Sequence, residues 1–241
     1  MLLYGKNSVL QRLRRQPESI HKIFLDENFE DPYILTIAGR RKIHVVRMRR
    51  KEFLRLKRAD RLQGIIAEVG MFTYTAFQDL LTGSGGQRHS LIFLDSINDP
   101  HNLGSIIRTL ACFGGFAVAI PKHGACEVND TAMHVATGGE NYVPVAMVTN
   151  MASALLEAKK AGYWVVGSVV DGKEELGRVD FPFPLCLVLG SEGKGIRPGI
   201  KNHLDVSVRL PMPGAHLSFN VAMACAIFCH EITKQRAHEK T

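Results

Sequence analysis

Apolar and polar positions alternate in short blocks through the first 70 residues. Val9, Leu10 and Leu13 are spaced as on one face of a helix, which predicts a helix over 5–15. The blocks that follow predict a strand at 20–26, a weak helix at 29–39, a strand at 42–48, a short basic helix at 49–58 and a strand at 62–69. Alternating strands and helices favour a small α/β unit in which helices pack on a mixed sheet.

A polar stretch rich in glycine and serine interrupts this pattern near residue 85. Such a composition is typical of a linker, because it offers no apolar surface to bury. We therefore place a linker at 71–90, between a domain at 1–70 and a second domain at 91–241.

The second domain has longer blocks, and its strand-like blocks are apolar throughout. The predicted strands are 91–95, 116–120, 143–148, 163–170, 184–190 and 206–211, and the predicted helices are 103–113, 129–137, 151–162 and 218–237. Strands that are apolar on both faces indicate a parallel sheet with helices on both faces. Ligands of such sheets bind at the C-terminal ends of the strands, so the loops that follow the strands are the first places to search.

Length and composition exclude several classes of protein. The 241 residues are 46% apolar, which is enough for a substantial core. No stretch approaches the roughly 20 uninterrupted apolar residues of a membrane-spanning helix. The start of the chain lacks the order of a signal peptide, because its basic cluster follows the short apolar run. We expect a cytoplasmic protein.

The five cysteines include no CxxC pair, which argues against a disulfide framework. Cys225, Cys229 and His230 lie close together on the predicted last helix, as some metal ligands do. The sequence offers no second pair of ligands, and small buried cysteines on an apolar helix explain the pattern better. We expect no metal.

The positive charge is concentrated in the first domain. The net charge of the chain is +7, and residues 1–70 hold 16 Lys/Arg and 8 Asp/Glu, so this third of the chain carries the whole excess. A dense basic segment binds polyphosphate by releasing counterions, although a solvated face of a basic protein is the alternative. We predict an RNA-binding surface made of Arg40, Arg41, Lys42, Arg47, Arg49, Arg50 and Lys51.

Three loops of the second domain carry polar residues directly after apolar strands. In the first, Asn102 precedes a helix that contains Arg108; an arginine there can clamp a phosphate, but a helix cap and a surface arginine are the plainer alternative. In the second, glycines surround Glu192 in neither a Walker nor a GxGxxG pattern, so a simple turn would explain it. In the third, Ser218 and Asn220 stand at a helix start, where an N-cap is the alternative.

Taken together, the order and spacing of these loops resemble the three motifs of the SpoU (TrmH-type) family, in the SPOUT superfamily of RNA methyltransferases. The first motif, Asn-x-Gly-x-x-x-Arg, is matched by Asn102, Gly104 and Arg108. The second, a hydrophobic-Gly-x-Glu-x-x-Gly turn, is matched by Gly190, Glu192 and Gly195. The third, a hydrophobic-Pro-Met segment before Ser-hydrophobic-Asn-Val-x-x-Ala, is matched by Leu210, Pro211, Met212, Ser218, Phe219, Asn220, Val221 and Ala224.

The resemblance covers residues 91–241, and residues 1–70 are similar, more loosely, to an L30e-like RNA-binding domain. It implies an α/β fold with a C-terminal trefoil knot and a homodimer whose active site is built from both chains. It also implies S-adenosylmethionine as cofactor, with the adenine held by main-chain groups of the knotted loops. The cofactor-binding residues implied in this way are Thr137, Gly138, Leu189, Gly190, Gly195, Ile196, Leu210, Met212, Ser218 and Phe219.

The implied reaction is methyl transfer to a ribose 2′-hydroxyl of RNA. The residues assigned to catalysis are Asn102, Arg108, Glu192, Ser218 and Asn220. Because arginine stays protonated in nearly every protein environment, we interpret Arg108 chiefly as a phosphate clamp that orients the ribose. Glu192 then holds Asn102 or the arginine, and the remaining polar side chains bond the ribose.

Three readings of the function remain open at this stage. The basic first domain favours ribosomal RNA of the 23S type over transfer RNA as substrate. A SPOUT enzyme that methylates a base nitrogen is the nearest alternative. An RNA-binding or ribosome-assembly protein that has lost turnover is the alternative from another class, although all five polar motif residues are present.

Overall fold

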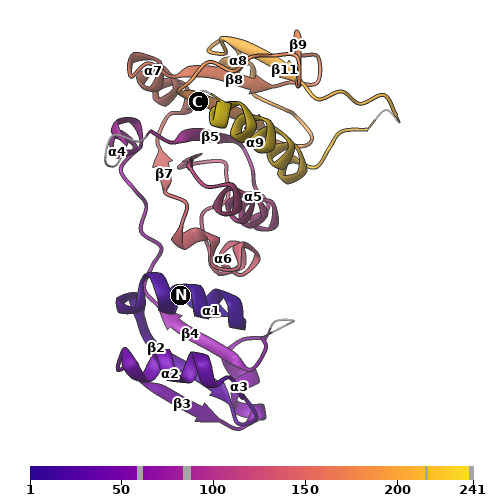
Figure 1. The fold of residues 1–241 in the computed structure, drawn as a ribbon. Helices are drawn as coiled ribbons and strands as arrows, with labels where there is room; N and C mark the ends of the chain where they lie inside the picture. Colours follow the sequence, from indigo (N-terminus) through magenta and orange to yellow (C-terminus); the bar gives the residue numbers. More distant parts are fainter. Residues whose placement is uncertain (59–61, 84–87, 215–216, 239–241) are drawn as a thin grey trace.

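The computed structural model describes residues 1–58, 62–83, 88–214 and 217–238. They form two units stacked end to end (Figure 1). The end of the basic segment at 59–61 and the glycine-rich stretch at 84–87 lie outside the described residues.

The first unit is a four-stranded sheet in the order β1-β4-β2-β3, with β3 parallel to β2 and the other pairs antiparallel. Its elements are β1 (Leu2–Tyr4), α1 (Lys6–Arg15), the 3-10 turn η1 (Pro17–Ser19), β2 (Ile20–Asp26), α2 (Pro32–Arg40), β3 (Val45–Met48), α3 (Arg50–Leu56) and β4 (Ile65–Val69). The six predicted elements are present. Neither β1 nor η1 was predicted, because three residues are too few to show a periodicity.

The segment predicted as a linker is partly helical. Helix α4 (Phe77–Thr82) begins seven residues after residue 70 and buries Leu80 and Leu81. Both leucines join the apolar cluster of the second unit. Part of the segment at 71–90 therefore packs against the second unit.

The second unit is a seven-stranded sheet in the order β7-β6-β5-β10-β8-β11-β9, and every neighbouring pair is parallel, as predicted. Its elements are β5 (Ser90–Asp95), α5 (Pro100–Phe113), β6 (Phe116–Pro121), α6 (Asp130–Ala136), the 3-10 turn η2 (Gly139–Asn141), β7 (Val145–Val148), α7 (Met151–Lys160), β8 (Trp164–Ser168), β9 (Glu174–Glu175), β10 (Leu185–Gly190), α8 (Pro198–Lys201), β11 (Val206–Arg209) and α9 (Val221–His238). The short β9, α8 and η2 were not predicted.

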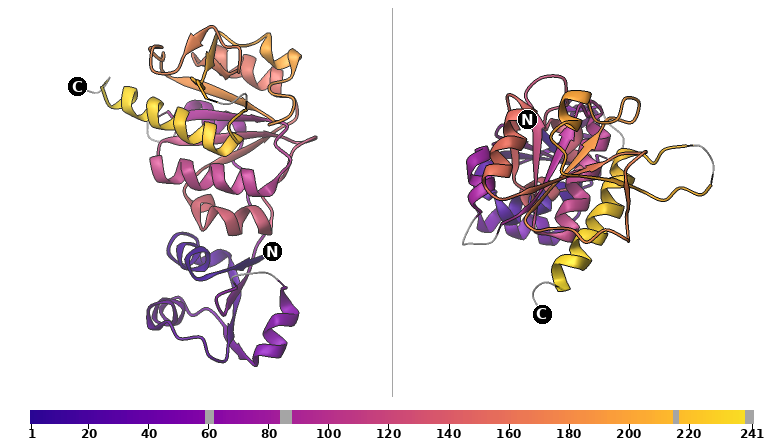
Figure 2. Two further views of the ribbon diagram at one scale, coloured as in Figure 1. Left: turned by 90° about the vertical axis from the view of Figure 1, so that its right-hand side faces the viewer. Right: turned by 90° about the horizontal axis from the view of Figure 1, so that it is seen from above.

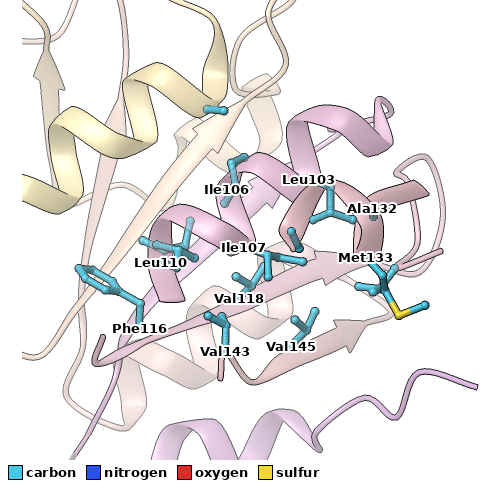
Figure 3. Close-up of a cluster of buried hydrophobic side chains, with 14 of the residues drawn as sticks. Leu103, Ile106, Ile107, Leu110, Phe116, Val118, Ala132, Met133, Val143 and Val145 are labelled. Atoms are coloured by element: carbon cyan, nitrogen blue, oxygen red, sulfur yellow. The ribbon is translucent and has the colours of Figure 1, made fainter. Parts of the chain in front are cut away.

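Helices cover both faces of this sheet (Figure 2). Successive residues of β5 point to opposite faces: Ile92 and Leu94 join the apolar cluster under α5, α6 and α9, whereas Leu91 and Phe93 join the cluster under α4, α7 and α8. Figure 3 shows part of the first cluster, where α5 and α6 pack over β6 and β7. Burial on both faces explains why these strands are apolar throughout.

The three loops singled out in the sequence follow β5, β10 and β11. Because the strands are parallel, their C-terminal ends lie at one edge of the sheet, and the loops meet there. Within the described ranges, no helix is long and apolar enough to span a membrane, and no three His, Cys, Asp or Glu side chains are grouped as metal ligands. Cys225 and Cys229 are free and buried, with their sulfurs 3.8 Å apart.

Candidate functional site

Three polar side chains from the three loops meet at this edge. The Nδ2 amide of Asn102 donates to Oε1 of Glu192 at 3.2 Å, and Nδ2 of Asn220 donates to Oδ1 of Asn102 at 2.8 Å. Asn220 also donates to Glu192 Oε1, so one carboxylate oxygen accepts from both amides. The three residues come from sequence positions up to 118 apart, and their hydrogen bonds join the loops into one network.

The start of α5 explains the position of Asn102. Asp99 is the N-cap residue: its carboxylate accepts from the backbone N–H of His101 at 2.8 Å, and Pro100 occupies the first turn. Asn102 lies in the first turn of α5, and its side chain extends from this turn to Glu192. Gly104 has a packing role, because a Cβ at this position would lie 2.5 Å from the carbonyl oxygen of Ala132 in α6.

The glycine-rich turn after β10 folds back on itself. A Cβ at Gly190 would lie 2.1 Å from the carbonyl carbon of Gly195, so only glycine fits. Gly195 has a φ of 63°, in the left-handed region that glycine adopts without strain. Glycine at position 190 therefore lets the backbone of residues 195 and 196 pack directly against the end of β10.

An ion pair closes the base of this turn. Asp95 is fully buried at the end of β5, directly beside Gly190 in the register of the two strands. Its carboxylate accepts from the backbone N–H of Arg197 at 2.9 Å and from Nε of Arg197 at 2.7 Å. Neither residue was singled out in the sequence, because no local pattern connects positions 102 residues apart.

A hollow of about 380 Å³ opens beside the glycine turn. Six of the residues assigned to the cofactor line it: Leu189, Gly190, Gly195, Ile196, Ser218 and Phe219. Leu210 and Met212 line an adjoining hollow of about 890 Å³, and Ser218 lines both. The first hollow is completed by residues 168–171, at the end of β8, and by Val221 and Ala224, at the start of α9. The sequence had not assigned these residues to a cofactor site.

Thr137 and Gly138 line neither of these hollows. Thr137 caps the C-terminus of α6 in the left-handed conformation. A Cβ at Gly138 would lie 2.4 Å from Cβ of Gln11, so this glycine allows α6 to approach α1 of the first unit. Gly138 therefore lies at the contact between the two units.

Arg108 and Ser218 stand apart from the amide–carboxylate network. Both side chains are exposed, and within the described part of the chain neither forms a hydrogen bond or an ion pair. Arg108 lies two turns along α5 from Asn102. Its guanidinium is therefore free to bind an anion from solution or from a bound RNA.

The basic segment divides into free and engaged side chains. Arg47 donates to the carbonyl oxygens of Glu27 and Phe29, each at 3.2 Å. Arg50 pairs with the buried Asp26 at 2.8 Å, and its hydrogen bond lowers the pKa of that carboxyl. The five other predicted RNA-binding residues are exposed without a side-chain hydrogen bond or ion pair within the described residues: Arg40, Arg41, Lys42, Arg49 and Lys51.

Comparison with known proteins agrees with this arrangement. Residues 89–230 match the SpoU rRNA Methylase family, and residues 2–75 match the family described as RNA 2′-O ribose methyltransferase substrate binding. The 23S rRNA (guanosine-2′-O-)-methyltransferase of Pseudomonas aeruginosa is 35% identical over 240 residues, covering 97% of this chain and 96% of that relative. The protein of the same name from Ralstonia nicotianae is 34% identical, covering 98% of this chain and 96% of its own.

Solved structures show the same fold. The SpoU methyltransferase AviRb from Streptomyces viridochromogenes, in complex with the cofactor AdoMet, superposes with a TM-score of 0.83 at 20% identity and covers 99% of this chain and 91% of its own. The AdoMet-bound rRNA methyltransferase from Sinorhizobium meliloti has a TM-score of 0.79 at 21% identity and covers 98% of this chain and 87% of its own. At these identities the likeness concerns the fold.

Proposed function

Because the chain belongs to the SpoU rRNA methylase family, we propose that it transfers a methyl group from S-adenosylmethionine to a ribose 2′-hydroxyl in ribosomal RNA of the 23S type. The observation that carries this proposal is the meeting of Asn102, Glu192 and Asn220 beside a hollow walled by the glycine turn. The three polar side chains supply groups that can position a nucleophile, and the hollow supplies a place for the methyl donor.

The residues of the hollow fit this cofactor. Its volume of about 380 Å³ lies in the range of small-molecule sites, roughly 300–1,000 Å³. The space that a Cβ at Gly190 would need is filled by the turn itself, so backbone groups stand where an adenine is to be bonded. Gly190 and Phe219 of this hollow and Leu210 of the adjoining one would hold the adenine, with Ile196 and Met212 as walls. When bound, the sulfonium supplies the electrophilic methyl group.

The protein's own residues then position the nucleophile. Glu192 accepts hydrogen bonds from the amides of Asn102 and Asn220, which fixes the orientation of both. The free hydroxyl of Ser218 and the remaining amide N–H of Asn102 are left to bond the ribose. Arg108, which is free and exposed, binds the phosphate beside the target ribose, and this contact brings the 2′-hydroxyl to the methyl group.

We further propose a homodimer with a knotted C-terminal segment, working in the cytoplasm. The chain leaves β11, forms the third loop and packs α9 against α5 and β10, so the glycine turn and the start of α9 share one hollow. Met223 and Ile227 expose apolar surface on α9, and Leu217 and Phe219 do so on the loop before it. A second copy that covers these side chains would also bring its own Arg108 to the shared site.

The test of the activity is a nuclease digest of total RNA from a strain that lacks the gene, analysed by mass spectrometry for 2′-O-methylated nucleosides. We expect one such nucleoside to disappear, and to return with the wild-type gene but not with Arg108→Ala. Unchanged nucleosides, together with no methyl transfer from labelled cofactor to ribosomal RNA of the deletion strain, would favour a binding protein without turnover. A new methylated base instead of a methylated ribose would favour base chemistry.

The domain at 1–70 is proposed to hold the RNA through its free basic side chains. Changing Arg40, Arg41 and Lys42 together to Gln removes three positive charges that have no partner within the described residues. RNA affinity should fall, and the slope of log affinity against log salt should flatten by up to about 0.7–0.9 for each lost phosphate contact. Cofactor affinity should not change. Full RNA affinity in this variant would mean that the segment is only a solvated face.

A further inference from the structure

A third hollow lies where the two units meet, and nothing in the proposed catalytic site uses it. It measures about 440 Å³ and is lined by Arg12, Met71, Phe72, Glu140, Asn141 and Tyr142, among others. These residues come from α1, from the segment that joins the units, and from η2 and the residue after it. We call this junction, with the residues that line its hollow, the seam. Figure 1 shows α1 facing α6 across it.

Two arginines of α1 lie over exposed tyrosines, and one of these tyrosines, Tyr142, lines the hollow. The guanidinium of Arg15 is 4.3 Å from the ring centroid of Tyr142, a ring that is itself 43% exposed. The guanidinium of Arg14 is 5.2 Å from the ring of Tyr33, which is 52% exposed. Within the described ranges neither arginine forms an ion pair, so no carboxylate neutralises them. Planar cations on exposed rings are surfaces on which unpaired bases stack.

The wall of the hollow also holds unused hydrogen-bonding groups. Arg12 and Glu140 are buried and paired at 3.3 Å, yet Nε of Arg12 and Oε2 of Glu140 have no hydrogen-bond partner. Oδ1 of Asn141 is buried without a partner as well. The residues that line the hollow thus carry one donor and two acceptors that the described part of the protein leaves unbonded.

The seam is continuous with the catalytic residues. Gly139 directly precedes the residues of the hollow, and a Cβ on it would lie 3.1 Å from Cα of Arg108. Tyr142 also bonds across the seam, because its hydroxyl donates to Oε1 of Gln11 at 2.7 Å. This end of the hollow therefore packs against the helix that carries Arg108.

We propose that this seam binds an unpaired segment of the RNA substrate next to the target nucleotide, with one base stacked on the Arg15–Tyr142 pair and a neighbouring base in the hollow. The inference rests on the proposed RNA methyl transfer and adds a contact surface separate from the basic segment at 40–51. It assigns selection of single-stranded RNA to the junction of the two units.

The test uses the full chain and a short fluorescent RNA of mixed sequence, measured single-stranded and annealed to its complement. Tyr142→Ala removes the ring, and Tyr142→Phe keeps the ring but loses the bond to Gln11. We expect single-strand binding to weaken about 5- to 150-fold in Tyr142→Ala, the range measured for loss of one stacked base, and to change less than about twofold in Tyr142→Phe. Duplex binding and cofactor affinity should stay the same in both.

A second measurement keeps the inference falsifiable if Tyr142→Ala is poorly folded. The same RNA, carrying 5-iodouridine, is cross-linked by light to the wild-type protein, and the attached peptide is identified by mass spectrometry. Attachment at Phe72 or Tyr142 supports the seam, whereas attachment confined to 40–51 overturns it. Equal losses in the Ala and Phe variants would also overturn it, since they would report the hydrogen bond to Gln11.

RNA binding at the seam and the proposed methyl transfer are tested by different variants. If Arg108→Ala abolishes methyl transfer to ribosomal RNA while Tyr142→Ala binds and methylates normally, the activity stands and the seam does not. If no variant and no wild-type protein transfers methyl groups, the activity itself is wrong, and binding to the seam remains measurable on its own.

Discussion

Gly190→Ala tests the tightest backbone contact beside the hollow that we propose for the cofactor. The added methyl group would lie 2.1 Å from the carbonyl carbon of Gly195 and 2.2 Å from the nitrogen of Ile196. Both contacts are with backbone, so the turn would have to move by about 1.3 Å or more to restore van der Waals separations of roughly 3.4–4.0 Å. No flexible side chain can absorb this movement.

The expected magnitude follows from that displacement. Overpacking of a closed site costs about 1–3 kcal/mol, which for a chain of this size lowers Tm by roughly 2–12 °C. Because the displaced turn carries the main-chain groups assigned to the adenine, we expect the Kd for S-adenosylmethionine to rise at least about tenfold, or 1.4 kcal/mol. Gly193→Ala is the matched control, since a Cβ there meets nothing within 4 Å.

Isothermal titration calorimetry with S-adenosylmethionine and thermal denaturation measure the two effects on the same preparations. Gly190→Ala should lose both cofactor affinity and stability, and Gly193→Ala should keep both. Affinity within about twofold of wild type in Gly190→Ala would refute the assignment of this turn to the cofactor. Equal losses in the two variants would show that any side chain on the turn is harmful, and that the close approach at Gly190 is not the cause.

Three further predictions concern charged residues. In Glu192→Gln, single-turnover methyl transfer should slow at least about tenfold, whereas the Kd for the cofactor should stay within about twofold of wild type. The reason is that a charge-assisted hydrogen bond of about 1.5–3 kcal/mol no longer orients the amides of Asn102 and Asn220. An unchanged rate would contradict the network. In Asp95→Asn, the KM for the cofactor should rise about tenfold, with kcat at saturation little changed. Arg197→Lys should retain more affinity for the cofactor than Arg197→Ala. An effect on kcat alone would exclude a role of this ion pair in shaping the glycine-rich turn. The hydrogen bond from Arg50 lowers the pKa of Asp26, so its stabilisation is present above the ordinary pKa of the carboxyl and is lost as pH falls through the lowered one. Arg50→Gln should therefore move acid unfolding of the first unit, followed by circular dichroism, to higher pH, and an unchanged midpoint would show that the pair is too solvent-screened to matter.

Local periodicity was sufficient for most of the fold. The parallel order of the larger sheet follows from strands such as 91–95 that are apolar on every residue, since only burial on both faces requires such a run. The meeting of Asn102, Glu192 and Asn220 also follows, because loops after parallel strands share one edge. Elements of two or three residues, such as β1 and β9, were missed because they are too short to show a period.

What the sequence alone determined is the class of fold, the concentration of charge in the first 70 residues and the three polar loops that follow apolar strands, because each is a pattern of neighbouring residues. Only the tertiary structure decided which distant residues touch. It paired Asp95 with Arg197 under the glycine turn, and it placed Gly138 against Gln11 where the two units meet. Such contacts depend on how helices cross and how units dock, and the free energy of that packing is shared among residues too far apart in the chain for any local pattern to record.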